Sequence, residues 1–508
     1  MYKMIILTPE RIRMAEDRAN KAGLSYLKMM ENAGKGCSKH ILKRYGKAQR
    51  IVVLCGKGKN GGDGFVIARC LTYAGKKVTV IKLFDAPSDA LSESRRELVP
   101  PFTPVITYGN NKAIARRALE DADITVDAVF GIGFSGALPN DVREVNRICA
   151  SSNSVKIAID LPSGVSVNGI AADCFRADET LSMLCLKKEH VYKPFSEICG
   201  KVTVIPIGIS VESSRGLFTA SPEELRGILP PRPFNSNKGT FGKAAIIAGS
   251  GKMPGAAILA AKGAISSGAG LVSVVFPDAC RDIICGAVPE CIHEPLKTTA
   301  DGMLSAENTE DILRALSACR AAAIGCGLGK SEDGAKILDK LLHGYKGILI
   351  IDADGINILA EHMDLLKNVS CTVLLTPHPG EMSRLTGMTV EAVNASREKT
   401  AALFAREHGV YVLLKGANTV IATPDGKIFI NTTGSTALSR GGSGDLLTGI
   451  TVSLASQGLS PSDALLLGAY LHGAAGEIAE KRFSPYAATV ERIADCLPES
   501  FLRLYECR

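Results

Sequence analysis

The sequence lacks the signals that mark three large classes of protein. It holds no run of five like charges, so a nucleic-acid-binding tail is not indicated. Its apolar runs all fall short of the roughly 18 residues needed to span a bilayer, and the N-terminus turns charged within ten residues. The 15 cysteines are odd in number and include no CxxC pair, which argues against a disulfide framework and against a zinc site.

What remains is ordinary globular composition in a chain of 508 residues, which is long enough for two domains. The net charge of +7 is spread thinly and suits anionic small molecules. We therefore expect a cytoplasmic protein with buried free thiols, without a nucleic-acid or membrane partner. We also expect a homo-oligomer.

The first half alternates helical spacing with short β-branched runs. Thr8-Pro9 predicts a helix start, and helical spacing continues to about Tyr45. Segments long enough for crossover helices separate most of the expected strands, which is typical of a doubly wound, Rossmann-like parallel sheet. The expected strands are 51–55, 77–83, 124–130, 155–160 and 201–207.

A proline-rich stretch between Ile207 and Gly239 is interpreted as a linker, so we place the domains at 1–212 and 213–508. A second α/β series follows, and two apolar-striped helices, at about 444–457 and 462–481, close the chain. The expected strands of the second half are 243–249, 270–276, 346–354, 372–378, 410–416, 419–424 and 427–432.

Three glycine- or aspartate-bearing loops of the first half each follow an expected strand. Parallel sheets bind ligands beyond the carboxyl ends of their strands, so these loops are expected to meet at one edge. Their bare amides, and the helix start after the first loop, favour a phosphorylated ligand. A single loop of this kind is as often only a tight turn, but three together favour binding. The loops are Lys59 to Asp63, Gly131 to Ala137 and Asp160 to Gly164.

Asn60, Asp127 and Ser163 offer oxygen atoms but neither thiolate nor imidazole. That donor set favours a hard cation over a transition metal.

The combination of NGGDG, DAVFGIGFSG and DLPSG resembles the NAD(P)H-hydrate epimerase domain and covers the whole first half. The resemblance implies interconversion of the C6 epimers of hydrated NADH or NADPH beside a potassium ion held by Asn60, Asp127 and Ser163. It implies Asp160 as a substrate contact, and we predict it as the catalytic acid–base group because the C6 hydroxyl must leave and return. The implied substrate-binding residues are Lys59, Asn60, Gly61, Gly62, Asp63, Gly131, Ile132, Gly133, Phe134, Ser135, Gly136, Ala137 and Asp160.

In the second half, SRGGSGDLLTG opens a helix behind three glycines, with Asp445 in its first turn. Asp445 taken alone is as consistent with a helix cap as with catalysis. The glycines argue for a ligand, since each costs about 0.5 to 1 kcal/mol of chain entropy relative to alanine. The outward amides would form an anion hole.

This GxGD pattern resembles the ribokinase-like fold, and HPGE with KGANT and GGSGD resembles the ADP- or ATP-dependent NAD(P)H-hydrate dehydratase over roughly residues 230–490. The resemblance implies that ADP, with Mg²⁺, phosphorylates the C6 hydroxyl and that phosphate then leaves, releasing AMP and phosphate. Asp445 would take the hydroxyl proton. Substrate contacts would be Ala256, Gly329, His378, Pro379, Gly380, Glu381, Met382, Ser383, Arg384 and Asp445, and nucleotide contacts Lys415, Gly416, Ala417, Asn418, Thr419 and Gly444. Asp352 and Asp354 either help to order Mg²⁺ or simply end a strand.

The sequence thus predicts a bifunctional repair enzyme that acts on hydrated NADH and NADPH, with ADP favoured over ATP. Two alternatives stay open at this point. One is a vitamin or sugar kinase, because GxGD alone occurs in such enzymes. The other is that the Rossmann-like half only binds or scaffolds.

Overall fold

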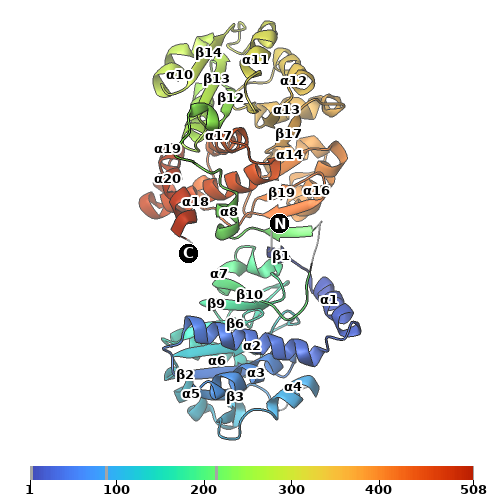
Figure 1. The fold of residues 1–508 in the computed structure, drawn as a ribbon, viewed down its shortest axis with the longest axis vertical. Helices are drawn as coiled ribbons and strands as arrows, with labels where there is room; N and C mark the ends of the chain where they lie inside the picture. The colour runs from blue at the N-terminus through green and yellow to red at the C-terminus, as the bar shows by residue number, and fades with distance from the viewer. Residues whose placement is uncertain (1–3, 86–89, 212–215, 507–508) are drawn as a thin grey trace. The chain divides into compact units, whose positions relative to one another are not determined.

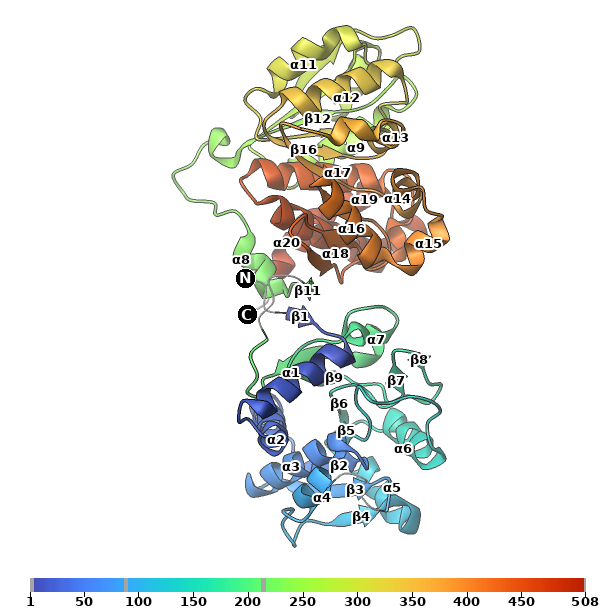
Figure 2. The same cartoon turned by 90° about the vertical axis from the view of Figure 1, so that its right-hand side faces the viewer.

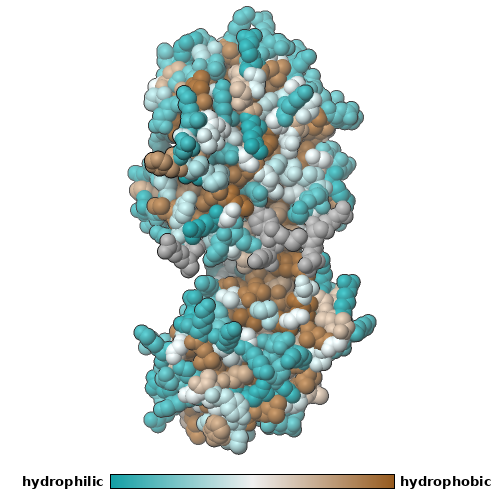
Figure 3. Space-filling model, in the orientation of Figure 1, coloured by the Kyte–Doolittle hydropathy of each residue, from teal (hydrophilic) through white to brown (hydrophobic). Residues whose placement is uncertain are grey.

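The computed structural model describes residues 4–85, 90–211 and 216–506. The chain divides into two compact units, Met4–Ser213 and Ser214–Arg508, which occupy the blue-to-green and green-to-red parts of the ribbon in Figure 1. Each cysteine with a described position is a free thiol. Within the described ranges, no helix combines the length and apolar character that a membrane crossing requires. On the face drawn in Figure 3, both units carry mainly hydrophilic side chains with apolar ones among them.

A parallel sheet forms the centre of the N-terminal unit, in the order β10-β9-β6-β5-β2-β3-β4. Most of its connections contain a helix, which is what parallel pairing of successive strands requires. The chain leaves β2 toward β3 on one side and returns to β5 on the other, so the topological switch point lies between β2 and β5. The strands are β2 (Arg50–Cys55), β3 (Lys77–Lys82), β4 (Val105–Thr107), β5 (Ile124–Ala128), β6 (Val155–Ile159), β9 (Glu179–Met183) and β10 (Lys201–Ile205).

Helices cover both faces of this sheet, as Figure 2 shows. Alternate residues of β2 point to opposite faces: Val53 packs in one core with Phe65, and Leu54 packs in another with Val142. The unit is therefore doubly wound, as predicted. Before the sheet come β1 (Met4–Ile6), α1 (Pro9–Lys21) and α2 (Tyr26–Arg44), and within it α3 (Lys59–Tyr73), α4 (Ala90–Arg96), α5 (Lys112–Glu120), α6 (Asn140–Ser151), α7 (Phe195–Cys199) and the hairpin of β7 (Val165–Ser166) and β8 (Gly169–Ile170).

The C-terminal unit is built on a second sheet, which runs β11-β20-β19-β18-β17-β16-β15-β12-β13-β14. The strands from β18 to β14 pair in parallel, whereas β19 pairs antiparallel with both β18 and β20. The strands are β11 (Gly216–Thr219), β12 (Lys243–Ile247), β13 (Leu271–Pro277), β14 (Ile292–Leu296), β15 (Ala321–Ile324), β16 (Ile348–Ile351), β17 (Thr372–Leu375), β18 (Tyr411–Leu414), β19 (Val420–Ala422) and β20 (Lys427–Ile430).

Helix α17, which carries Asp445, is almost wholly buried and packs closely on α9. Glycine makes this approach possible, since a Cβ on Gly449 would lie 1.9 Å from the carbonyl oxygen of Ala260. The helices are α8 (Pro222–Ile228), α9 (Pro254–Ile265), α10 (Arg281–Ala287), α11 (Thr309–Leu316), α12 (Glu332–Gly344), α13 (Asp354–Glu361), α14 (Pro379–Thr386), α15 (Val390–Ala395), α16 (Arg397–His408), α17 (Ser443–Ser456), α18 (Pro461–Ala487), α19 (Val490–Asp495) and α20 (Leu497–Glu506).

The structure differs from the sequence prediction at several points. Strands β4, β9, β11, β14 and β15 lie outside the expected strand ranges. The predicted linker over 207–239 is wrong in part, because it contains β11 and α8; a Ser221–Glu224 capping box marks the start of α8. The final long helix runs on to Ala487, with a break in helical geometry at Ser484.

Candidate active sites

A cleft of about 670 Å³ lies at the carboxyl ends of β2, β5 and β6, beside the switch point of the N-terminal sheet. This volume lies within the roughly 300 to 1,000 Å³ usual for small-molecule sites. The first turn of α3, the loop after β5 and Asp160 line it, and one face of α1 adds Ile12, Arg13 and Glu16. The predicted meeting of the three loops at one edge is therefore confirmed.

Most of the predicted substrate-binding residues line this cleft, but Gly61, Gly62 and Gly136 do not. Gly61 and Gly62 face the protein interior, where an added Cβ would lie 2.1 Å from the Gly56 carbonyl oxygen and 2.7 Å from the Met30 side chain. These two glycines permit close packing at the start of α3, and their predicted substrate contact stays a prediction. The predicted residues that line the cleft are Lys59, Asn60, Asp63, Gly131, Ile132, Gly133, Phe134, Ser135, Ala137 and Asp160.

Asp160 is held as an anion by its neighbours. Its Oδ1 accepts a hydrogen bond from the buried Lys187 ammonium, and its Oδ2 accepts one from the Ile132 amide at 3.0 Å. Burial alone would raise the pKa of Asp160, but the Lys187 charge and hydrogen bonds outweigh it, so the pKa lies below its ordinary value. Asp160 is thus poorly suited to donate a proton at neutral pH, contrary to the donor half of the role predicted for it.

Asp127 and Ser163 lie next to each other at the ends of β5 and β6. The Ser163 hydroxyl and amide both donate to the Asp127 carboxylate at 2.7 Å. Burial raises the pKa of Asp127 to about 6, against the lowering effect of these hydrogen bonds. Asn60 donates through Nδ2 to the Ile159 carbonyl oxygen at 3.2 Å, and its buried Oδ1 has no hydrogen-bond partner. An orphaned buried oxygen of this kind suits a cation ligand.

Two further carboxyls in the cleft carry raised pKa values. Burial is the main cause for both Glu16 and Asp63, and the Asp160 charge adds to it in each case. Reasoning from the sequence missed Glu16 and Lys187. Lys187 follows β9, a strand that was not predicted, so its place near the cleft could not be inferred. Glu16 is one of several charged residues of α1, and the sequence does not distinguish it from the others.

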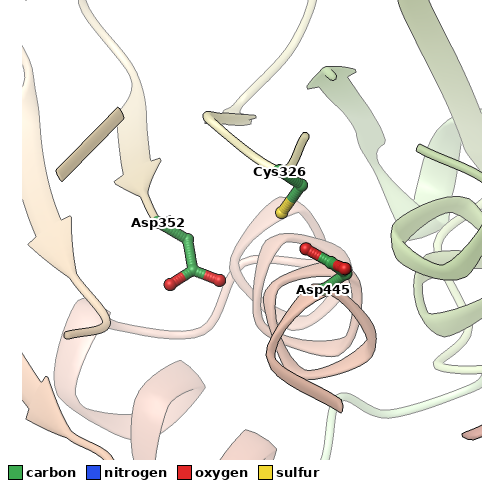
Figure 4. Close-up of side chains that lie close together, drawn as sticks. All are labelled: Cys326, Asp352 and Asp445. Atoms are coloured by element: carbon green, nitrogen blue, oxygen red, sulfur yellow. The ribbon is translucent and has the colours of Figure 1, made fainter. Parts of the chain in front are cut away.

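The C-terminal unit places Asp445 in the first turn of α17, behind Gly442 in the left-handed conformation (φ 91°). Figure 4 shows that the Asp445, Asp352 and Cys326 side chains lie close together. One possible ligand atom of each lies within 4.8 Å of those of the other two. Burial, and then the Asp352 charge, raise the pKa of Asp445 to about 7. The group can therefore change protonation near neutral pH, as a general base must.

Lys415 bridges the carboxylates around Asp445. It donates to Asp352 Oδ1 at 2.7 Å and lies 3.8 Å from Glu381 Oε2. The other oxygen of Asp352 accepts from the buried Thr448 hydroxyl at 2.8 Å. A Cβ on Gly444 would stand 3.2 Å from Lys415 Nζ, so the glycine keeps the cation close to the start of α17. Asp352 is therefore part of the site rather than only the end of a strand.

The predicted substrate residues around His378 form the start of α14. His378 caps this helix: its Nδ1 accepts from the amides of Gly380 and Glu381 at 2.9 and 3.2 Å. Burial lowers the pKa of His378, which supports a neutral contact rather than a charged one. Met382 is fully buried, so its side chain belongs to the core. The prediction that this side chain contacts the substrate is therefore corrected.

Hydrogen bonds to α13 hold two of the predicted substrate contacts, Arg384 and Gly329, in place. Arg384 donates to Asn357 at 2.8 Å, and Asp354 accepts from the Gly329 amide at 2.9 Å. Asp354 therefore orders the Gly329 loop. Ala256 packs beside that loop's Gly327, where an added Cβ would lie 2.7 Å from the Ala256 Cβ.

The predicted nucleotide loop follows β18. Gly416 adopts φ 146°, and Asn418 adopts φ 54° with its amide donating to the Asn431 carbonyl oxygen at 3.3 Å. The Thr419 hydroxyl donates to Gly416, and the Ala417 carbonyl oxygen accepts from Arg397. The loop is thus fixed by its own contacts beside Lys415. Reasoning from the sequence did not identify the buried His472 of α18, whose Nε2 lies 3.1 Å from the Ser443 hydroxyl at the start of α17.

Two family models match the chain, one in each unit. The model described as NAD(P)H-hydrate dehydratase matches residues 244–499, and that described as YjeF-related protein N-terminus matches residues 27–189. Among solved structures, the ADP/ATP-dependent NAD(P)H-hydrate dehydratase of Bacillus subtilis is 33% identical and covers 56% of this chain and 97% of its own, with a TM-score of 0.48.

Curated relatives match almost end to end. A protein of Moorella thermoacetica named bifunctional NAD(P)H-hydrate repair enzyme Nnr is 36% identical over 494 residues, which is 94% of this chain and 93% of the relative. One of the same name from Thermofilum pendens is 33% identical over 502 residues, with 96% and 94% covered. The chain belongs to the family of bifunctional NAD(P)H-hydrate repair enzymes.

Proposed function

We propose that this chain epimerises the R and S hydrates of NADH and NADPH and dehydrates the S form to the intact cofactor. The epimerase activity is assigned to residues 1–212 and the dehydratase activity to residues 213–508. The observation that carries the proposal is the match of repair enzymes to both units of the chain, at 94% coverage. The chemistry of the two sites supports it, because one gathers carboxyls and lysines in a cleft and the other sets a raised-pKa carboxyl at a glycine-rich helix start.

In the epimerase, the ring nitrogen expels the protonated C6 hydroxyl as water, and a cationic ring is left behind. Water then adds back to either face. Asp160, kept anionic by Lys187, stabilises that cation, and the amides around Gly131 and the start of α3 hold the phosphates. Potassium would be held by Asn60, Asp127 and Ser163, where it would neutralise the Asp127 charge and satisfy the Asn60 oxygen.

In the dehydratase, ionised Asp445 accepts the proton of the C6 hydroxyl as the hydroxyl oxygen attacks the terminal phosphorus of the nucleotide. The bond from that phosphorus to the bridging oxygen breaks, and the shortened nucleotide leaves. The amides at the start of α17 stabilise the transferred group, and Lys415 offers a cation to the phosphates. The ring nitrogen's lone pair then expels phosphate, which leaves with the C6–O bonding pair. Loss of a C5 proton to water forms the C5=C6 double bond and restores the neutral reduced ring. Phosphate departs far more readily than hydroxide, which is why the nucleotide is needed.

We infer ADP as the phosphoryl donor, which would leave AMP and phosphate. The Bacillus relative is named for either ADP or ATP. Mg²⁺ would be bound through the nucleotide phosphates. The protein offers it no all-oxygen cluster at Asp445, because Cys326 shares that position and Asp352 already binds Lys415 and Thr448. A cytoplasmic location and a homo-oligomeric state belong to the same proposal.

The test uses wild-type protein and chemically hydrated NADH whose two epimers have been separated by chromatography. With ADP or ATP and Mg²⁺, reduced-nicotinamide absorbance should return from the S epimer at once and from the R epimer only as fast as it is converted. With no nucleotide, either pure epimer should become a mixture faster than in buffer. A stable phosphorylated product from a vitamin alcohol, with no absorbance recovery from the hydrates, would support a kinase instead.

A further inference from the structure

The epimerase cleft requires a group that can give a proton to the departing hydroxyl. Asp160 is poorly placed for this, because both of its carboxyl oxygens already accept hydrogen bonds, one from a buried ammonium. Lys187 itself is committed, since it also donates to the Ser182 hydroxyl at 2.8 Å and to the Met183 carbonyl oxygen at 3.0 Å. The donor must therefore be sought elsewhere in the cleft lining.

Glu16 meets the requirement from a different wall. It lies on α1, four residues after Ile12 and seven after Pro9, so the three residues share the helix face that lines the cleft. Its side chain is half-buried, and the charges of Lys59, Asp160 and Lys187 act on it there. Glu16 therefore faces the same space as the Asp160–Lys187 pair.

Asp63 is the other protonatable carboxyl in the lining, and the charges of Lys59, Glu16 and Asp160 act on it. It stands on α3, on the same side of the cleft as Lys59 and Asn60, whereas Glu16 stands on the separate helix α1. Asp63 is therefore the rival that the experiment must separate from Glu16.

We propose that Glu16 is the general acid–base residue of the epimerase, an assignment that rests on the proposed function of this domain. Its carboxyl gives its proton to the C6 hydroxyl as the C6–O bond breaks, the bonding pair leaves with the water, and the ring nitrogen's lone pair forms the C=N bond. When water adds back to C6, the C–O bond reforms and the surplus proton returns to the Glu16 carboxylate. The cycle consumes nothing, and Asp160 stays ionised throughout beside the cationic ring. The two carboxyls divide the work because their surroundings differ, as in other carboxyl pairs.

The pH dependence follows from the groups around Glu16. Burial raises its pKa above its ordinary value, Asp160 and Asp17 raise it further, and Lys59 and Lys187 oppose them. Because an acid catalyst must hold its proton, epimerase kcat should fall as pH rises through that pKa. The titratable and charged groups that interact with Glu16 or line the same cleft are Arg13, Asp17, Tyr26, Lys57, Lys59, Asp63, Asp160, Cys185 and Lys187.

The experiment measures exchange of one purified hydrate epimer as a function of pH in the full-length chain. Glu16→Gln keeps the size of the side chain but holds no titratable proton, so kcat should drop by about 10²- to 10⁴-fold and the alkaline limb should disappear. Glu16→Asp should recover part of the rate and restore a limb. Glu10→Gln, an exposed carboxyl earlier on the same helix, should behave as wild type.

Three outcomes would overturn the assignment: an unchanged kcat and pH profile in Glu16→Gln, a rise in KM alone, or loss of the limb in Asp63→Asn but not in Glu16→Gln. Melting curves of each variant report whether the domain is folded. If Glu16→Gln melts early, the rate and pH profile of Glu16→Asp decide the assignment instead. If wild-type protein itself shows no exchange above the buffer rate, the proposed epimerase function is wrong. That result differs from failure of the Glu16 assignment, in which wild-type protein exchanges the epimers and Glu16→Gln does so equally well.

Discussion

Replacing Asp445 by asparagine should abolish the dehydratase and make the C-terminal domain more stable. The pKa of this carboxyl rises from its ordinary 3.8 to about 7, because it is buried and lies near Asp352. Holding it ionised in the folded protein therefore costs up to about 4 kcal/mol. Asparagine has nearly the same shape and carries no charge, so the variant should escape that cost. It should also lose the base, with a fall in dehydratase kcat of at least about 10²-fold.

The sign of the pH effect is fixed by which state holds the proton. Below about pH 4, both folded and unfolded chains hold it, so wild type and Asp445→Asn should melt alike. Between about pH 4 and 7, only the folded chain keeps it, so wild type progressively loses stability relative to the variant. Above about pH 7 the difference should be constant. The dehydratase rate of wild type should rise with pH over the same range and level off once Asp445 is ionised.

Differential scanning calorimetry at several pH values, with dehydratase assays on the same samples, measures both effects. A gain of about 4 kcal/mol should raise Tm by several degrees or more in a domain of this size. The exposed Asp495→Asn is the matched control and should change neither quantity. An Asp445→Asn variant with wild-type activity, or one that melts with wild type above pH 7, would refute the reasoning that burial has made this group a poised base.

Two further substitutions test the framework of the sites. In Gly131→Ala, the new Cβ would stand 2.8 Å from Asp160 Oδ2, so epimer exchange should fall at least about tenfold while dehydration persists. Gly109→Ala, whose new Cβ would make ordinary contacts only, is the control. Equal exchange rates in the two variants would contradict the idea that the new methyl group crowds Asp160. Lys415→Met removes the partner of the buried Asp352, so nucleotide KM should rise and the domain should lose about 3 to 5 kcal/mol. Adding Asp352→Asn should restore stability, measured by denaturant unfolding, but not nucleotide affinity; recovery of both would show that the lysine is only structural.

The sequence predicts the layered α/β fold well where strands are β-branched and follow the expected spacing. It misses β9 and β15, because ETLSM is half polar and AAAI is nearly all alanine, and neither resembles a typical strand. It also reads the proline-rich stretch as a linker, although Ser221 and Glu224 cap a helix there. Short central strands owe their conformation to neighbours on both sides, which local composition does not reveal.

Motif residues of the sites were predictable, whereas the ion pairs that set their protonation states were not. Asp160 and Asp445 follow from the loops that carry them, but Lys187 and Asp352 acquire their roles through ion pairs that span 27 and 63 residues of chain. Those partners decide the chemistry. The Lys187 ammonium makes Asp160 a stable anion, and the Asp352 charge helps to make Asp445 a base near neutrality. Sequence patterns therefore identify where chemistry occurs, but the protonation states depend on contacts made only in the fold.

The two active sites use half-buried carboxyls in opposite protonation states, which affects how repair of the R epimer depends on pH. Its conversion needs protonated Glu16 and then ionised Asp445, so the epimerase should weaken and the dehydratase strengthen as pH rises. The coupled rate should pass through a maximum, with its acid limb set by one domain and its alkaline limb by the other. Rates of absorbance recovery from pure R epimer measure this directly. Excess wild-type dehydratase domain, added as a separate protein, should remove only the acid limb, because dehydration then no longer limits the coupled rate. If both limbs remained, the acid and alkaline limbs would not arise from Asp445 in one domain and Glu16 in the other.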